Sequence, residues 1–176
     1  VGVTGHDAGY PHLGLNHFVD SRPELMADVD LFVNLDHLAA HGDEHVSGTG
    51  LTDMLGLQVD VGVQRPGDEE RALFTTRHPA LAATFLPHLV AHGLLLTAAV
   101  PTIPEVNANG DLEGLVGALG VPSVNLTMAT PHYHTVEDTP ARIPAGQLAR
   151  CVRAHRDFLT DAMALPREVL RAGIGF

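Results

Sequence analysis

Short apolar runs bounded by glycine, proline and acidic residues recur along the chain. Such runs are typical of buried strands, and they predict strands at 1–4, 29–36, 94–100 and 121–127. The first run is followed shortly by Asp7, and the second ends at Asp36. Two predicted strands therefore deliver a carboxylate near their carboxyl ends, where α/β sheets bind ligands.

Apolar residues at helical spacing predict the helices between these strands. Leu81, Phe85 and Leu89 predict a helix over 78–92, which Gly93 should end and which Pro87 should kink or split. Shorter helices are predicted over 13–19, after Ser21 as an N-cap, and over 111–119.

The last long element is a predicted helix over 144–165. Its apolar stripe is expected to comprise Leu148, Val152, His155, Leu159 and Ala162. We interpret His155 on this stripe as a hydrogen-bonded core residue rather than a ligand.

Residues 41–72 are predicted to form an insert of loop and hairpin. The segment 41–56 is polar and rich in glycine, and "LQVDVGV" at 57–63 alternates with the period of a strand. "RALFTT" at 71–76 is expected to return as the second arm of a hairpin.

Strands alternate with helices, which predicts an α/β fold of a single domain over 1–176. The expected architecture has three layers, with a mixed and mostly parallel sheet flanked by helices. No internal repeat or long linker divides the chain.

Composition narrows the chemistry. Acidic residues outnumber basic ones by 21 to 10, and the formal charge of −11 argues against a nucleic-acid partner. Charged residues, glycine or proline interrupt every apolar run before it could cross a membrane. With Cys151 as the only cysteine, a metal site would have to use carboxylates and some of the 12 histidines.

Three strand-end loops hold candidate metal ligands. A carboxylate from each of two strand ends and a histidine from a third loop would suit a zinc-like ion. Strand-end aspartates also cap helices, however, and loop histidines are often only solvated. The candidates in the three loops are His6 and Asp7, Asp36 and His37, and His132, His134 and Asp138.

Four motifs in sequence order resemble the co-catalytic di-zinc aminopeptidase family. They are "VTGHDAGYPHLGLNHF", "FVNLDHLA", "GDLEGLVGALGVPSVNL" and "YHTVEDTPARIPAGQLARCVRAHRDFL". The resemblance spans most of the chain outside the insert. It implies a zinc-exopeptidase-like fold of which this chain is the C-terminal part, with the N-terminal strands missing.

The resemblance also implies roles for individual residues. His134 and Asp7 would bind one zinc ion, and Asp36 would bind the other. His6 occupies the position of the family's general-base glutamate, where an imidazole could accept a proton near neutral pH. The family's bridging aspartate and first histidine lie upstream of this pair, so a second zinc ion requires residues ahead of Val1.

The remaining residues of the last motif would support the site. Tyr133 would line the cleft, and Asp138 and Thr139 would brace the loop behind the metal ligand His134.

These residues predict a zinc-dependent, metallo-aminopeptidase-like hydrolase that cleaves peptides or small amides. Because His6 replaces the usual glutamate, a non-catalytic interaction or receptor-type domain of the same fold is the alternative, and a generic α/β domain is a third. No membrane partner is expected. Substrate specificity and oligomeric state stay open, and only the resemblance favours secretion.

Overall fold

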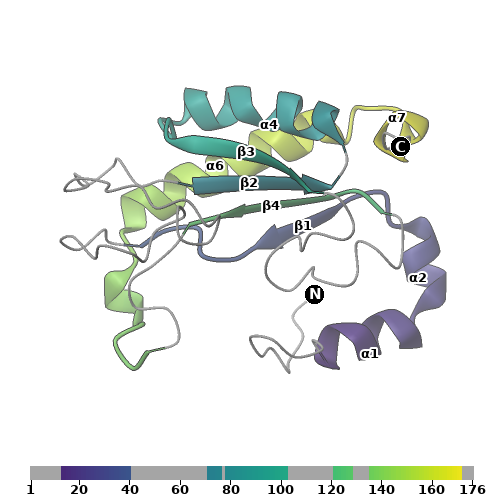
Figure 1. Cartoon of the computed structure of the whole chain (residues 1–176), viewed down its shortest axis with the longest axis horizontal. Helices are drawn as coiled ribbons and strands as arrows, with labels where there is room; N and C mark the ends of the chain where they lie inside the picture. Colours follow the sequence, from purple (N-terminus) through teal and green to yellow (C-terminus); the bar gives the residue numbers. More distant parts are fainter. Residues whose placement is uncertain (1–12, 41–70, 77, 103–120, 129–134, 172–176) are drawn as a thin grey trace.

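The computed structural model of the chain describes residues 13–40, 71–76, 78–102, 121–128 and 135–171. These residues form a mixed four-stranded sheet flanked by helices, which is an α/β arrangement (Figure 1). The strand order is β1-β4-β2-β3. The strands are β1 (Phe32–Leu35), β2 (Arg71–Thr76), β3 (Thr97–Thr102) and β4 (Ser123–Thr127).

Two of the three strand pairings are parallel, as expected for a mostly parallel sheet. β1 pairs with β4 and β2 pairs with β3 in parallel, whereas β2 runs antiparallel to β4. The carboxyl ends of β1 and β4 therefore lie at the same end of the sheet as the amino ends of β2 and β3 (Figure 1).

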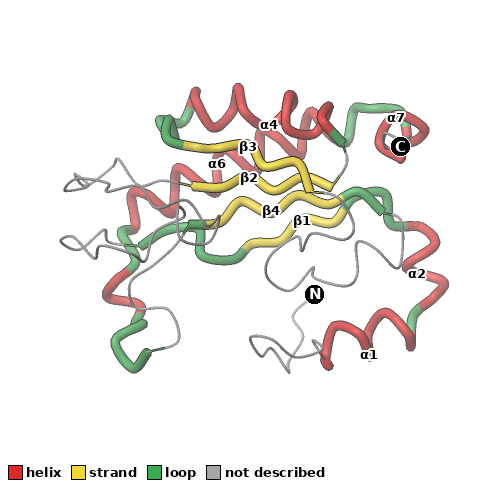
Figure 2. The backbone as a smooth tube through the Cα atoms, viewed as in Figure 1, coloured by secondary structure: helices red, strands yellow, loops and turns green. Residues whose placement is uncertain are grey.

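The described helices α1, α2, α4 and α6 agree with four of the predicted ones to within a few residues (Figure 2). The predicted strand at 1–4 and the predicted helix at 111–119 lie outside the described residues. The helices are α1 (Leu13–Ser21), α2 (Pro23–Asp28), α4 (Pro79–Ala91), α6 (Ala145–Ala162) and α7 (Arg167–Arg171), with a short 3₁₀ helix, η1 (Pro140–Arg142).

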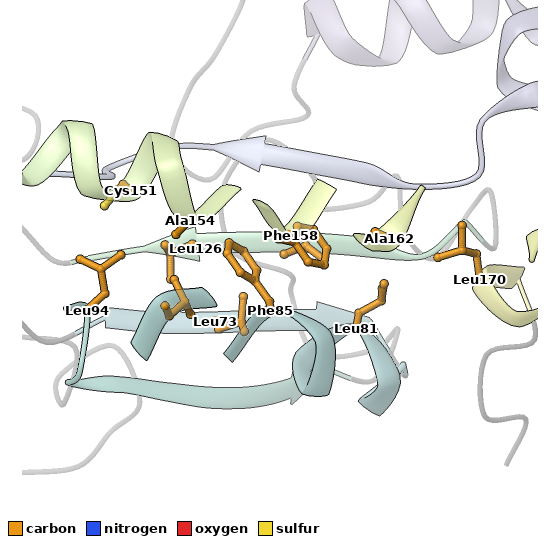
Figure 3. Packing of buried hydrophobic residues seen from close by; sticks show 12 residues of the cluster. Leu73, Leu81, Phe85, Leu94, Leu126, Cys151, Ala154, Phe158, Ala162 and Leu170 are labelled. Atoms are coloured by element: carbon orange, nitrogen blue, oxygen red, sulfur yellow. The ribbon is translucent and has the colours of Figure 1, made fainter. Parts of the chain in front are cut away.

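The main core lies between the sheet and two helices, α4 and α6, that cover the same face (Figure 3). Phe85 of α4 stacks on Phe158 of α6 with ring centroids 4.3 Å apart. Leu73 of β2 and Leu126 of β4 close the core from the sheet side. All four side chains are fully buried, and each such burial contributes about 1.5–3 kcal/mol.

Two histidine–aspartate pairs join α4 to α6 at the border of this core. His88 Nε2 lies 2.8 Å from an Asp161 carboxylate oxygen, and His92 Nε2 lies 2.7 Å from one of Asp157. The hydrogen bond from His92, followed by the one from Arg156, lowers the pKa of Asp157. The two helices are thus held together by polar contacts as well as by apolar packing.

The buried face of α6 differs from the predicted stripe. His155 and Ala162 are buried as expected, but Val152 is 56% exposed. Leu148 and Leu159 are only half-buried. The face that α6 turns toward the core combines small residues, two polar ones and Phe158. The buried residues are Gln147, Cys151, Ala154, His155, Phe158 and Ala162.

β3 is not the buried strand that its apolar run predicted. It is the edge strand of the described sheet, and Leu95 and Leu96 just before it are 69% and 47% exposed. An uninterrupted apolar run is typical of an interior strand that is covered on both faces. β3 instead has only one neighbour among the described strands.

β2 occupies an interior position in the sheet. Its two edges are taken by β3 and β4, so no edge of β2 is open to a hairpin partner from 57–63. Of the predicted insert 41–72, only Arg71 and Ala72 are described, and both belong to β2.

Two local signals at helices were wrong in detail. Ser21 is the last residue of α1 and donates its hydroxyl to the Phe18 carbonyl, while Arg22 occupies the N-cap position of α2. Pro87 lies inside α4 without splitting it. Its side chain is exposed, and the packing of Phe85 and Leu89 on either side stabilises the continuous helix.

The predicted stop of α4 at Gly93 is confirmed. Gly93 has a φ of 74°, and its N–H donates to the Val90 carbonyl while the N–H of Leu94 donates to the Leu89 carbonyl. These two bonds form a Schellman motif, which requires a left-handed residue at this position.

Two glycine substitutions should therefore have opposite effects. An added Cβ would meet nothing within 4 Å at Gly93 or at Gly146 in the first turn of α6, so only the backbone distinguishes them. We expect Gly93→Ala to lower the free energy of unfolding by about 1 kcal/mol. Gly146→Ala should raise it by up to about 1 kcal/mol, because alanine favours the helix. Urea denaturation of both variants measures the difference, and equal effects would contradict it.

Candidate functional site

The carboxyl ends of β1 and β4 lie side by side. Leu35 is in register with Leu126, so Asp36 follows β1 at the point where β4 also ends. Beyond the strands, the N–H of Met128 donates to the carbonyl of His37 at 3.1 Å. The chain therefore enters segment 129–134, which contains His132 and His134, from a position bonded to the residue after Asp36.

Asp36 presents a partly accessible carboxylate at this end of the sheet. Its side chain is 32% exposed, and one carboxylate oxygen lies 3.4 Å from Nε2 of His37. Within the described part of the chain, His37 is the only basic side chain paired with this carboxylate. The carboxylate is thus not neutralised there by an arginine and keeps the capacity to bind a cation.

His37 adopts a strained backbone conformation. Its φ of 48° lies in the left-handed region, which costs a non-glycine residue about 1–2 kcal/mol. The bond from Met128 to its carbonyl holds this conformation in place. Strain of this kind is concentrated at functional sites in proteins, where the surrounding structure maintains it.

Helix α6 fixes the segment that follows. The N–H of Ala40 donates to Oε1 of Gln147 at 2.9 Å, and the Cys151 thiol donates to the carbonyl of Leu38 at 3.1 Å. Gln147 and Cys151 are one helical turn apart and both are buried. These contacts, which span more than 100 residues of sequence, position the chain immediately after Asp36.

Buried and partly buried polar side chains line the neighbouring strands. Asn34 of β1 is in register with Asn125 of β4, which is 2% exposed. Arg71 begins β2 at the same end of the sheet, because β2 runs antiparallel to β4, and it is 1% exposed. A buried guanidinium and a carboxylate thus belong to the same end of the sheet.

The described part of the "YHTVEDTP" motif forms a turn followed by η1. The N–H of Asp138 donates to the Thr135 carbonyl at 3.2 Å, and the N–H of Arg142 donates to the Thr139 carbonyl at 2.9 Å. The side chains of Asp138 and Thr139 are exposed. The backbone of these residues shapes the turn, and the bracing role of their side chains stays a prediction.

Five candidate site residues lie outside the described residues: His6, Asp7, His132, Tyr133 and His134. Their convergence with Asp36 therefore stays a prediction. Within residues 13–40, 71–102 apart from 77, 121–128 and 135–171, no group of three or more histidine, cysteine or acidic side chains could hold a metal ion.

The residues that position the segment after Asp36 were missed by the sequence analysis. Gln147 and Cys151 are a polar residue and a small one on the buried face of α6. Their residue types alone did not indicate that they contact the segment after Asp36. Arg71 begins the predicted strand 71–76, and no residue near it in the sequence indicates that it is buried.

His155 is the core residue that the sequence predicted. Its Nδ1 donates to the carbonyl of Cys151 at 2.8 Å, and its ring meets Phe85 edge to face at 4.9 Å. Burial lowers the pKa of His155, an effect that the bond to Cys151 only partly offsets. The imidazole is therefore a neutral packing group rather than part of the site.

Comparisons with protein-family models, with curated proteins and with solved structures find no match to this chain. The fold and site define an α/β domain with a carboxylate where two parallel strands end. None of the described helices is long and apolar enough to span a membrane. Any function must be argued from the residues themselves.

The contact between Gln147 and Ala40 should be important for stability. Gln147→Met keeps a side chain of similar length but leaves the buried Ala40 N–H without its acceptor. We expect the free energy of unfolding to fall by about 1–3 kcal/mol, measured by urea denaturation. Arg153→Met, at an exposed position of the same helix, is the control and should change it by less than about 0.5 kcal/mol. Equal effects would show that the contact contributes nothing.

His155 should make stability depend on pH. Its pKa is lowered in the folded state, so below about pH 6.5 the unfolded state binds a proton that the folded state resists. The free energy of unfolding should therefore fall as the pH drops below about 6.5. In His155→Leu this part of the fall should be absent. Denaturation from pH 7.5 to 5.5 compares the two, and identical slopes would contradict the prediction.

Proposed function

We propose that this chain is a zinc-dependent, exopeptidase-like hydrolase of peptide or small amide bonds, with the three-layer architecture of the zinc peptidases. The observation that carries the proposal is the bond between Met128 and His37. It starts the segment containing His134 beside the residue that follows Asp36. A carboxylate, and a histidine-containing segment that follows directly after Met128, are the parts that a zinc site at this end of the sheet needs.

The surroundings of Asp36 support the same interpretation. The carboxylate is partly accessible, and the basic side chain described beside it is a histidine rather than an arginine. α6 holds the following segment through Gln147 and Cys151, so the direction of the chain after Asp36 is set by a rigid element. A preorganised ligand on a rigid scaffold binds a metal ion at a smaller entropic cost.

Asp36 fits zinc as a carboxylate oxygen ligand of one ion, and Asp7 and His134 would bind the other, as the resemblance implies. Bound zinc would supply Lewis acidity, which polarises the scissile carbonyl and activates water. His6 would accept the proton of the attacking water. Tyr133 would contact the substrate in the cleft, and Asp138 and Thr139 would brace the loop that carries His134.

A non-catalytic binding domain of the same fold is the second candidate. The replacement of the family's glutamate by His6 favours it, because a different side chain alters both the reach and the position of the base. In that case the site would retain zinc and bind peptides without cleaving them.

Zinc content and amidase activity test the proposal. The full chain, reconstituted with zinc, should retain the metal after gel filtration and hydrolyse aminoacyl p-nitroanilides, and chelation should abolish the activity. Asp36→Asn should lose bound zinc, measured by mass spectrometry of the metal. His6→Ala should keep zinc and lose activity by about 10²–10⁴-fold, the usual contribution of a general base. Asp28→Asn, at an exposed position at the end of α2, is the control and should behave as the wild type.

The outcomes separate the two candidates. Zinc retained through Asp36 without amidase activity would support the binding domain. A chain that binds no zinc, or that binds it equally well as Asp36→Asn, would overturn both.

A further inference from the structure

We propose that the outer edge of β3 pairs with the same edge of a second copy of this chain, joining two sheets across a two-fold axis. This inference does not depend on the zinc site. It rests on the backbone pattern of β3, on the exposure of its side chains and on the absence of charge along it.

The hydrogen-bonding groups on the outer edge follow from the register. The N–H of Arg71 donates to the carbonyl of Leu96, and Arg71 is in register with Thr97. In a parallel ladder, alternate residues of a strand point their N–H and C=O groups toward the same neighbour. Residues 96, 98, 100 and 102 therefore face β2, and residues 97, 99 and 101 face outward. Pro101 lacks an N–H at an outward position, as is usual for proline in edge strands.

Among the described strands, β3 has a neighbour on one edge only, and two of its side chains are exposed. Ala98 and Ala99 point to opposite faces of the sheet, and both are exposed. A strand covered along its outer edge would rarely be exposed on both faces. The methyl groups of these alanines also leave room for a second backbone to approach.

Charge indicates which partner suits this edge. The chain carries a formal charge of −11, so two copies repel each other over most of their surface. The segment 94–102 contains no charged residue, although edge strands are commonly protected by charged side chains. Two copies that meet along this segment therefore place no like charges opposite each other.

One antiparallel register uses the outward groups best. In this register Thr97 of each copy lies opposite Ala99 of the other. The two pairs together form four backbone hydrogen bonds. Ala98 then lies opposite its own counterpart on the two-fold axis, as a non-hydrogen-bonded pair. Pro101 lies outside these four bonds, so its missing N–H removes none of them. Leu95, which is 69% exposed, would lie opposite Pro101 and become covered.

The register makes a specific cross-linking prediction. The Cα atoms of a non-hydrogen-bonded pair are about 4.5 Å apart, which allows a disulfide. Ala98→Cys should therefore form a covalent dimer on mild oxidation, seen on non-reducing gels. Val136→Cys, at a position 92% exposed on another part of the surface, is the matched control and should not. The native Cys151 is buried and should not contribute.

Sedimentation measures the association itself. The wild-type chain should change with concentration from 18.6 kDa to about twice that mass. Ala99→Pro removes an outward N–H from each copy and leaves the bonds to β2 in place. The dimer would lose two of its four backbone hydrogen bonds, so its dissociation constant should rise at least about tenfold. Circular dichroism should show that the variant stays folded. A wild type that is monomeric at all concentrations would overturn the proposal, as would a dimer that survives Ala99→Pro and is not cross-linked through position 98.

Discussion

The packing of α6 against α4 and the sheet is the interaction on which the rest of the described structure depends. Phe158 and Ala154 bury one part of the helix in the main core. The same helix holds the chain after β1 through Gln147 and Cys151. Loss of the apolar contact would therefore also release the segment that follows Asp36. Stability and site geometry are coupled through one helix, because its buried face performs both tasks.

Much of this fold could be predicted from local patterns. The apolar spacing in α4 and the glycine after it located that helix and its end, and "VDLFVNLD" placed Asp36 at the end of a strand. These features depend on residues that are close to each other in the sequence. The apolar period identified α6 as well, but it misplaced the buried stripe. Gln147 and Cys151 are buried because they bond to the backbone of Ala40 and Leu38, which are far away in the sequence.

What could not be predicted depends on contacts between distant segments. The hydrophobic run in β3 resembles a buried strand, and only the strand order shows that it is an edge. "RALFTT" has the composition of a hairpin arm, but its neighbours β3 and β4 come later in the chain. The Ala40–Gln147 bond spans 107 residues and leaves no periodic signal. Strand order and long-range polar contacts are therefore the properties that a single sequence conceals most completely.

The proposed zinc site and the proposed dimer interface lie at different borders of the sheet. Asp36 lies at one end of the strands, beside β1 and β4, whereas the outer edge of β3 runs along the far side of the sheet, beyond β2 (Figure 1). Pairing through β3 would extend the sheet sideways and would leave the carboxyl ends of β1 and β4 open. Because α4 and α6 cover one face of the same sheet, a second copy could join it without displacing the helix that positions the segment after Asp36. Association and ligand binding would thus use different borders of one sheet, and neither would require the other to change its packing.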